Sequence, residues 1–284
     1  GLQRRLPWHG ICFFSGMEMG LHSVAVEGGL RRVLVLDDDP TTLLVVSHRL
    51  QSFGLEVIAC RELEAAEAIL DHSRVDAVVT DLCVSPLGGL EGTRLVRHVA
   101  TNFPETDLLV MSSHTSDEVK RLVLAFGAIA FFEKPVDAAV LARQILRGRP
   151  PMPGHAPGRV QDVEILDDFL AANSIFAVLQ PIVHLQEGGG ETPLFGLESL
   201  ARAPRESILR NPEILFEYAS RKERLYETDL LCLRAGLEEA RRVGHGYRLF
   251  LNVQPRSMTR PEFAGRVLRL VQEAGFAPGD IIFE

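Results

Sequence analysis

Four short apolar runs in the first half of this 284-residue chain end in polar residues that suit a single site, and this order constrains the fold most strongly. The runs cover residues 33–36, 75–79, 108–111 and 128–132, and they lead to Asp37–Asp39, Asp81, Ser112 and Lys134 respectively. In an open α/β sheet, the carboxyl ends of parallel strands open onto one crevice. We therefore expect the carboxylates, a hydroxyl group and an amine to meet at one edge of a sheet.

Amphipathic stretches separate the apolar runs. Pro40 opens one of them and Gly54 closes it, in agreement with the residue preferences at helix starts and stops. The alternation of strand and helix predicts an α/β fold with a doubly wound, five-stranded parallel sheet. Crowded carboxylates repel one another unless a hard dication bridges them, so the acidic run Asp37–Asp39 together with Asp81 predicts a Mg²⁺ site. A nucleotide-binding α/β domain with acidic strand ends is the alternative.

Residues 31–148 resemble the receiver domain of two-component response regulators through the ordered motifs VLVLDDDP, VVTDL, LLVMSS and FFEKP. The resemblance implies that Asp81 accepts a phosphoryl group from a phosphohistidine on a sensor histidine kinase. It implies that Mg²⁺ is held by Asp37, Asp38, Asp81 and the backbone carbonyl of Cys83. It further implies that the conformational switch on phosphorylation involves Ser112, Phe131 and Lys134.

Composition argues against several other classes. The formal net charge of −8 disfavours an extended nucleic-acid surface, so a DNA-binding transcription factor is a weak alternative. The apolar stretch Ile11–Phe14 is too short for a signal peptide or a membrane span. The four cysteines are scattered without metal-binding spacing and are expected to be reduced thiols. We expect a cytoplasmic protein that binds neither DNA nor a membrane.

The chain divides by composition into a tail (1–30), the receiver-like domain (31–148), a linker (149–160) and a second domain (161–284). The stretch Arg147–Arg159 has four prolines and three glycines and no helical periodicity. Such a segment is a semi-stiff tether and not a continuous helical lever. We therefore expect the first domain to act on the second by direct docking or by dimerisation.

The second domain carries polar residues on strands that are otherwise apolar. In the segment LFGLESLARAP, the period of two places Glu198 and Arg202 on one face of a strand. Two later strands carry Asn252 and Glu284. With QPIV at 180–183, these residues resemble the amino-terminal half of the EAL domain, the family of cyclic-di-GMP phosphodiesterases and their degenerate relatives.

The EAL resemblance implies part of a (β/α) TIM-barrel-like fold. It implies that Glu198, Asn252 and Glu284 bind Mg²⁺ or Mn²⁺, and that Gln180 and Arg202 bind cyclic-di-GMP. Hydrolysis in the family needs two metal ions and further groups, so the chain as given is expected to be inactive while a longer parent protein hydrolyses cyclic-di-GMP. The alternative is a non-catalytic signalling or cyclic-di-GMP-binding module. Receivers often pair through the face formed here by residues 116–146, so a homo-oligomer is also expected.

Overall fold

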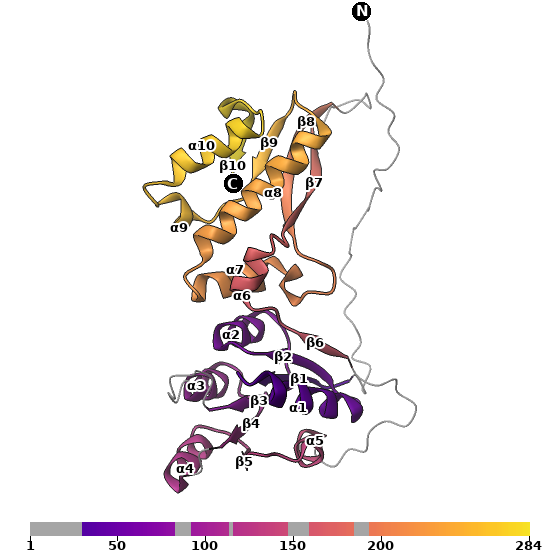
Figure 1. Ribbon diagram of the computed structural model, residues 1–284, viewed down its shortest axis with the longest axis vertical. Helices are drawn as coiled ribbons and strands as arrows, with labels where there is room; N and C mark the ends of the chain where they lie inside the picture. Colours follow the sequence, from indigo (N-terminus) through magenta and orange to yellow (C-terminus); the bar gives the residue numbers. More distant parts are fainter. Residues whose placement is uncertain (1–29, 83–91, 114–115, 147–158, 185–192) are drawn as a thin grey trace, which may run out of the picture.

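The computed structural model describes residues 30–82, 92–113, 116–146, 159–184 and 193–284 (Figure 1). The first domain, residues 30–146, alternates strand and helix throughout its described part. Its elements are β1 (Arg32–Leu36), α1 (Pro40–Ser52), β2 (Glu56–Cys60), α2 (Leu63–His72), β3 (Ala77–Asp81), α3 (Gly92–Asn102), β4 (Asp107–Ser112), α4 (Asp117–Ala125), β5 (Ala130–Glu133) and α5 (Ala138–Leu146).

The strands of the first domain form a parallel sheet with helices on both faces. Alternate residues of β1 show how the sheet is covered: Leu34 and Leu36 join one buried cluster with residues of α2 and α3, whereas Val33 and Val35 join another with residues of α1 and α5. The near-continuous apolar strands are explained by this burial on both faces. The predicted parallel α/β sheet is confirmed.

A sixth strand corrects the prediction of a five-stranded sheet. The strand order is β5-β4-β3-β1-β2-β6, and β6 (Val160–Asp162) pairs in parallel with the edge strand β2. Its ladder includes the bonds Val57 N–H to Arg159 O at 2.8 Å and Val163 N–H to Ala59 O at 2.9 Å. Residues assigned above to the end of the linker and the start of the second domain therefore belong to the first sheet. The predicted tail and most of the predicted linker, residues 1–29 and 147–158, lie outside the described residues.

The second domain, taken here as residues 163–284, contains a second sheet in the order β10-β9-β8-β7. Strand β7 runs antiparallel to β8, and the other neighbours are parallel. Its elements are α6 (Leu166–Ala171), β7 (Phe176–Val183), β8 (Leu194–Arg202), η1 (Ile208–Arg210), α7 (Pro212–Arg221), α8 (Leu225–Val243), β9 (Arg248–Leu251), α9 (Pro255–Met258), α10 (Phe263–Glu273), η2 (Pro278–Asp280) and β10 (Ile281–Phe283). A partial TIM-barrel-like fold for this domain stays a prediction.

The two domains pack directly against each other. Figure 1 shows α6 and α7 at the boundary, next to α2 of the first domain. One hydrophobic cluster crosses this boundary, because Ile69 and Leu70 of α2 pack in the same buried group as Phe169, Leu215 and Tyr218. Among the described residues, no helix is both long enough and apolar enough to span a bilayer.

Candidate functional site

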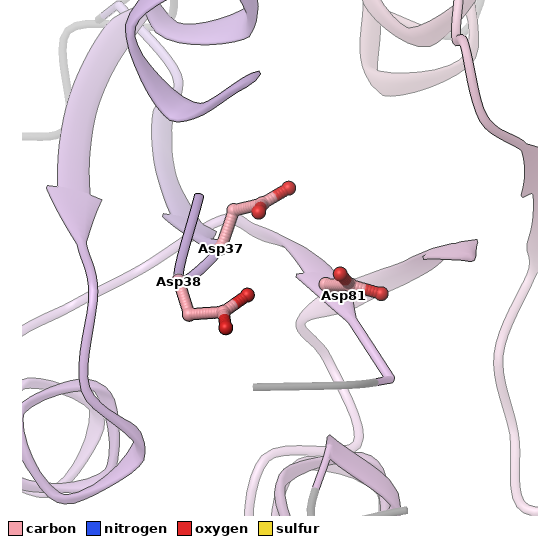
Figure 2. Close-up of side chains that lie close together, drawn as sticks. All are labelled: Asp37, Asp38 and Asp81. Carbon is pink, nitrogen blue, oxygen red and sulfur yellow. The ribbon is translucent and has the colours of Figure 1, made fainter. Parts of the chain in front are cut away.

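Three carboxylates gather at the carboxyl ends of β1 and β3. Asp37 follows β1, Asp38 comes next, and Asp81 is the last residue of β3. Each offers an oxygen, and the three oxygens lie within 4.8 Å of one another (Figure 2). Asp37 is fully buried and Asp81 is 4% exposed. The parallel pairing of β1 with β3 places these strand ends side by side, so the predicted convergence of these carboxylates is confirmed.

Lys134 holds two of these carboxylates. Its Nζ donates to Asp37 Oδ2 at 2.7 Å and to Asp81 Oδ2 at 2.6 Å. Burial raises the pKa of Asp37 in spite of the ammonium group beside it. Burial alone would lower the pKa of Lys134, but its hydrogen bonds to Asp37 and Asp81 raise it. The ammonium group therefore stays charged and offsets part of the repulsion between the two carboxylates.

Two of the remaining predicted residues of the first domain lie on β4 and β5, the strands that follow β3 in the sheet. Ser112 is buried at the end of β4, one position beyond the residue that pairs with Asp81. Phe131 lies on β5 and packs, half-buried, against the main core. Cys83 lies outside the described residues, so its predicted role as a ligand stays a prediction.

The third aspartate of the acidic run has a different task. Asp39 is the N-cap of α1, where its carboxylate accepts hydrogen bonds from the backbone N–H groups of Thr41 and Thr42 at 3.3 Å and 2.9 Å. These bonds satisfy donors that have no partner within the helix. The hydrogen bonds from Thr42 lower the pKa of Asp39. The carboxylate of Asp39 therefore caps α1, whereas Asp37 and Asp38 belong to the carboxylate cluster.

The donor set fits Mg²⁺. Carboxylate oxygens are the ligands that this ion prefers, and it commonly keeps several waters beside one or two carboxylates. Asp37, Asp38 and Asp81 bring such oxygens to one point from neighbouring strand ends. Two buried carboxylates and one half-buried carboxylate beside the ammonium group of Lys134 carry an excess of negative charge, which a dication would offset.

Three of the five residues predicted for a second site line one pocket in the second domain. Glu198, Arg202 and Asn252 border a pocket of about 400 Å³, and Asn252 Nδ2 donates to Glu198 Oε1 at 3.1 Å. Gln180 lies directly opposite Glu198 in the antiparallel pairing of β7 with β8. Glu284 follows β10. Its backbone forms hydrogen bonds with the backbone of Leu251 and of Val253, the two neighbours of Asn252.

Sequence reasoning missed other residues of this pocket. Its walls also include Glu213 and Phe216 of α7 and Cys232 of α8. Burial raises the pKa of Cys232 to about 12, so its thiol stays protonated and unreactive. The amphipathic pattern predicts the helices, but it does not say which residues turn toward β8. Asp229 accepts hydrogen bonds from the N–H of Gln254, which lines the pocket, and from the Ser257 hydroxyl.

Comparisons with known proteins place the first domain in a family. The model of the response regulator receiver domain matches residues 33–146. The CAI-1 autoinducer sensor kinase/phosphatase CqsS of Vibrio cholerae is 27% identical over 115 residues, which are 40% of this chain and only 17% of that relative's length. The regulatory protein VirG of Rhizobium rhizogenes is 27% identical over 217 residues, covering 72% of this chain and 84% of VirG. The chemotaxis protein CheY4 of Vibrio cholerae matches in structure with 27% identity and a TM-score of 0.38, covering 43% of this chain and all of CheY4 (100%).

The family match coincides with the part of the chain that forms the parallel sheet β1–β5. It also contains the acidic pocket of Asp37, Asp38 and Asp81, and the lysine that bridges two of these residues. Residues 33–146 of this chain therefore form a response regulator receiver domain of the two-component signalling family.

Proposed function

We propose that this chain is a cytoplasmic two-component response regulator in which Asp81 accepts a phosphoryl group from a sensor histidine kinase. The observation that carries the proposal is the buried cluster in which Lys134 contacts both Asp37 and Asp81. Asp81 ends a central strand of the sheet, and Lys134 follows the edge strand β5. The receiver match covers both residues.

The chemistry requires little covalent work from the protein. A carboxylate oxygen of Asp81 attacks phosphorus, a P–O bond forms, and the P–N bond of the phosphohistidine breaks to release the imidazole. Mg²⁺ bound by Asp37, Asp38 and Asp81 would neutralise charge that develops on the phosphoryl oxygens. The ammonium group of Lys134 already lies 2.6 Å from Asp81, so it can pair with the new phosphoryl group after a small movement. Ser112, on the neighbouring strand, is the proposed hydroxyl partner of that group, and Phe131 is proposed to change position with it.

Treatment with Mg²⁺ and acetyl phosphate tests the phosphoacceptor. We expect one added phosphoryl group by intact mass spectrometry, labile to hydroxylamine as acyl phosphates are, and none in Asp81→Asn. Asp117→Asn is the matched control, because Asp117 is an exposed aspartate of the same domain at the start of α4. Equal modification of Asp81→Asn and the wild type would refute the assignment.

For the second domain, we propose a cyclic-di-GMP site of the EAL type at the pocket that Glu198, Arg202 and Asn252 line. The guanidinium group of Arg202 suits a phosphate of the dinucleotide, and Gln180 is proposed to lie beside it. Glu198, Asn252 and Glu284 offer oxygen ligands to Mg²⁺ or Mn²⁺. These ligands carry at most two negative charges, which is little for the two-metal chemistry of phosphodiester hydrolysis. The proposal for this chain is therefore binding of the dinucleotide.

Isothermal titration with cyclic-di-GMP in the presence of Mg²⁺ or Mn²⁺ tests the second site. We expect Arg202→Ala to weaken binding at least tenfold, which corresponds to about 1.4 kcal/mol for one charge-assisted contact. Arg210→Ala serves as the control, because Arg210 is an exposed arginine of the same domain that does not line the pocket. Absence of binding by the wild type would remove the cyclic-di-GMP part of the proposal and leave the receiver intact.

A further inference from the structure

The carboxyl-terminal end of α7 is fixed to the receiver domain. Tyr218 is fully buried and donates a hydrogen bond to Glu62, just before α2. Arg221, the last residue of α7, contacts Glu67 at 2.7 Å and Asp71 at 2.5 Å, both on α2. Because Glu67 is only 2% exposed, solvent screens its attraction to Arg221 less than in a surface pair, and loss of this arginine would deprive a buried carboxylate of a charged partner. A displacement of α2 would therefore also displace the carboxyl-terminal end of α7.

The amino-terminal end of α7 is part of the pocket wall. Pro212, Glu213 and Phe216 line the same pocket as Glu198 and Arg202. Phe216 also packs against the hydrophobic cluster that crosses the domain boundary. At this end Glu213 lies 3.7 Å from His72 of α2. A single helix of 10 residues thus contacts α2 of the receiver at both ends, and its amino-terminal end also lines the pocket.

Packed elements also connect α2 to the phosphorylation site. Helix α3 begins at Gly92, whose N–H donates to Leu82 O at 3.0 Å, immediately after Asp81. Two residues further along α3, Arg94 contacts Glu67 at 2.6 Å. Glu67 is therefore shared between Arg94 of the receiver and Arg221 of α7. A displacement of α3 after a change at Asp81 would alter the pairing that holds α7.

Strand β6 keeps this contact in place. It adds to β2 as a sixth strand and leads within a few residues to α6, whose Leu166 N–H donates to the hydroxyl oxygen of Tyr218 at 3.1 Å. The sheet bonds join β6 to the receiver, and the shared core packs α2 against α7. The connection between the domains is a packed joint, which transmits small shifts because packed interiors resist compression.

We propose that α7 couples the two sites, so that ligand occupancy of the pocket and phosphorylation of Asp81 change each other's affinity through the shared carboxylate of Glu67. This inference rests on the proposed function, since it takes Asp81 and the pocket of Glu198 and Arg202 as the two sites. Coupling of binding is reciprocal by thermodynamic necessity. The same factor must therefore be seen from either site.

The test measures both directions in the full chain. Beryllofluoride with Mg²⁺ stands in for the phosphoryl group, and cyclic-di-GMP is the probe for the pocket. We expect beryllofluoride to change the Kd of cyclic-di-GMP by about fivefold or more. Cyclic-di-GMP should change, by the same factor, the beryllofluoride concentration that half-saturates the receiver site. If both ligands bind and each leaves the other's affinity unchanged, the coupling is refuted while the proposed function stands.

Three variants locate the path. Arg94→Ala removes the link between α3 and Glu67 and leaves α7 docked by Arg221 and by the Lys222–Glu62 pair at 2.8 Å. Arg221→Ala removes the contact of α7 itself. Both should bring the coupling factor close to one while each ligand still binds. Arg224→Ala is the matched control, because Arg224 pairs with Asp167 of α6 at 3.0 Å and should keep the wild-type factor. A wild-type factor in both Arg94→Ala and Arg221→Ala would overturn the proposal.

Hydrogen exchange measured without cyclic-di-GMP tests the coupling separately from the proposed cyclic-di-GMP site. Hydrogen exchange of the α7 backbone should change when beryllofluoride binds the wild type, and the change should be lost in Arg94→Ala. This response supports the path from Asp81 to α7 even if cyclic-di-GMP fails to bind. In that case the proposed ligand of the pocket is wrong. Bound beryllofluoride with unchanged exchange in α7 contradicts the coupling. If beryllofluoride fails to bind at Asp81, the proposed function is refuted. The coupling is then refuted too, because it takes Asp81 as one of its two sites.

Discussion

At Gly92 the backbone of α3 passes so close to the end of β3 that no side chain fits between them. A Cβ atom at this position would overlap the carbonyl oxygen of Asp81 and the backbone of Leu82. We expect Gly92→Ala to lower the free energy of unfolding by about 1–3 kcal/mol, as overpacking of a tight interior does, and to slow phosphorylation of Asp81. Urea denaturation and the acetyl phosphate assay measure the two effects.

Gly265 provides the control for this substitution. It lies on α10 with open space around the position of a Cβ atom, so Gly265→Ala should leave phosphorylation unchanged. Its stability should rise by up to about 1 kcal/mol, since alanine is the better helix former. A Gly92→Ala variant as stable and as reactive as the wild type would show that the close approach has no energetic consequence.

Asp229 provides a pH-dependent term in stability. Burial raises its pKa from the ordinary 3.8 to about 6. Between pH 4 and 6 the folded state therefore retains a proton that the unfolded state releases, so this residue lowers the free energy of unfolding as pH rises through that range. Above about pH 6 its effect is constant.

Asp229→Asn removes this titration and can keep both contacts, because its amide offers an acceptor to Gln254 N–H and a donor to the Ser257 hydroxyl. Relative to the wild type, we expect the variant to gain stability between pH 4 and 6 by an amount on the order of 2–3 kcal/mol. Urea denaturation of both proteins across that range measures the difference. A difference that is constant with pH would contradict the assignment.

Residues at strand ends could be predicted, and buried partners could not. Asp37, Asp81 and Lys134 follow apolar runs of a parallel sheet, so the chain order alone brings them together. Glu67 and Asp229 lie within helical stretches, where a carboxylate is ordinarily solvent-exposed. Their burial depends on contacts with α7 and with α9, which lie further along the chain.

At the scale of elements, the contact between α2 and α7 depends on Tyr218. Its hydroxyl donates to Glu62 and accepts from Leu166 N–H. Tyr218→Phe leaves that buried N–H without this acceptor, and we expect a loss of about 1–3 kcal/mol in the free energy of unfolding. Tyr247→Phe is the control: its hydroxyl donates to Ala240 O at 2.6 Å within the second domain, at a site that is only part-buried. Equal losses in both variants would show that the boundary contact adds nothing specific.

Most helices could be predicted from periodicity, whereas β6 could not. The sequence predicts a helical stretch near residues 212–221, and α7 has these bounds, with Asn211 as its N-cap. The strand β6 consists of only three residues after a segment rich in proline and glycine, too short for alternation to be visible. It forms because β2 offers unpaired backbone groups at an edge, which is a property of the folded sheet and not of the local sequence.

For the whole molecule, the shared core predicts that the two domains unfold together. Mg²⁺ and beryllofluoride at about 100 times their Kd should stabilise the receiver by about 2.7 kcal/mol, and hydrogen exchange in α10 should slow along with that in α1. Protection that rises in α1 alone, or two separate thermal transitions, would contradict this. A homo-oligomer through residues 116–146 stays a prediction, to be checked by light scattering with and without beryllofluoride.

The sixth strand also affects how this protein can recombine with others. Here a crossover within residues 147–158 would separate β2 from the strand that covers its edge. The donor receiver would keep a bare edge, and the incoming receiver would need a β2 that accepts Val160–Asp162 in the same register. A viable exchange must therefore transfer the receiver together with β6. The segment that is exchanged then ends after Asp162.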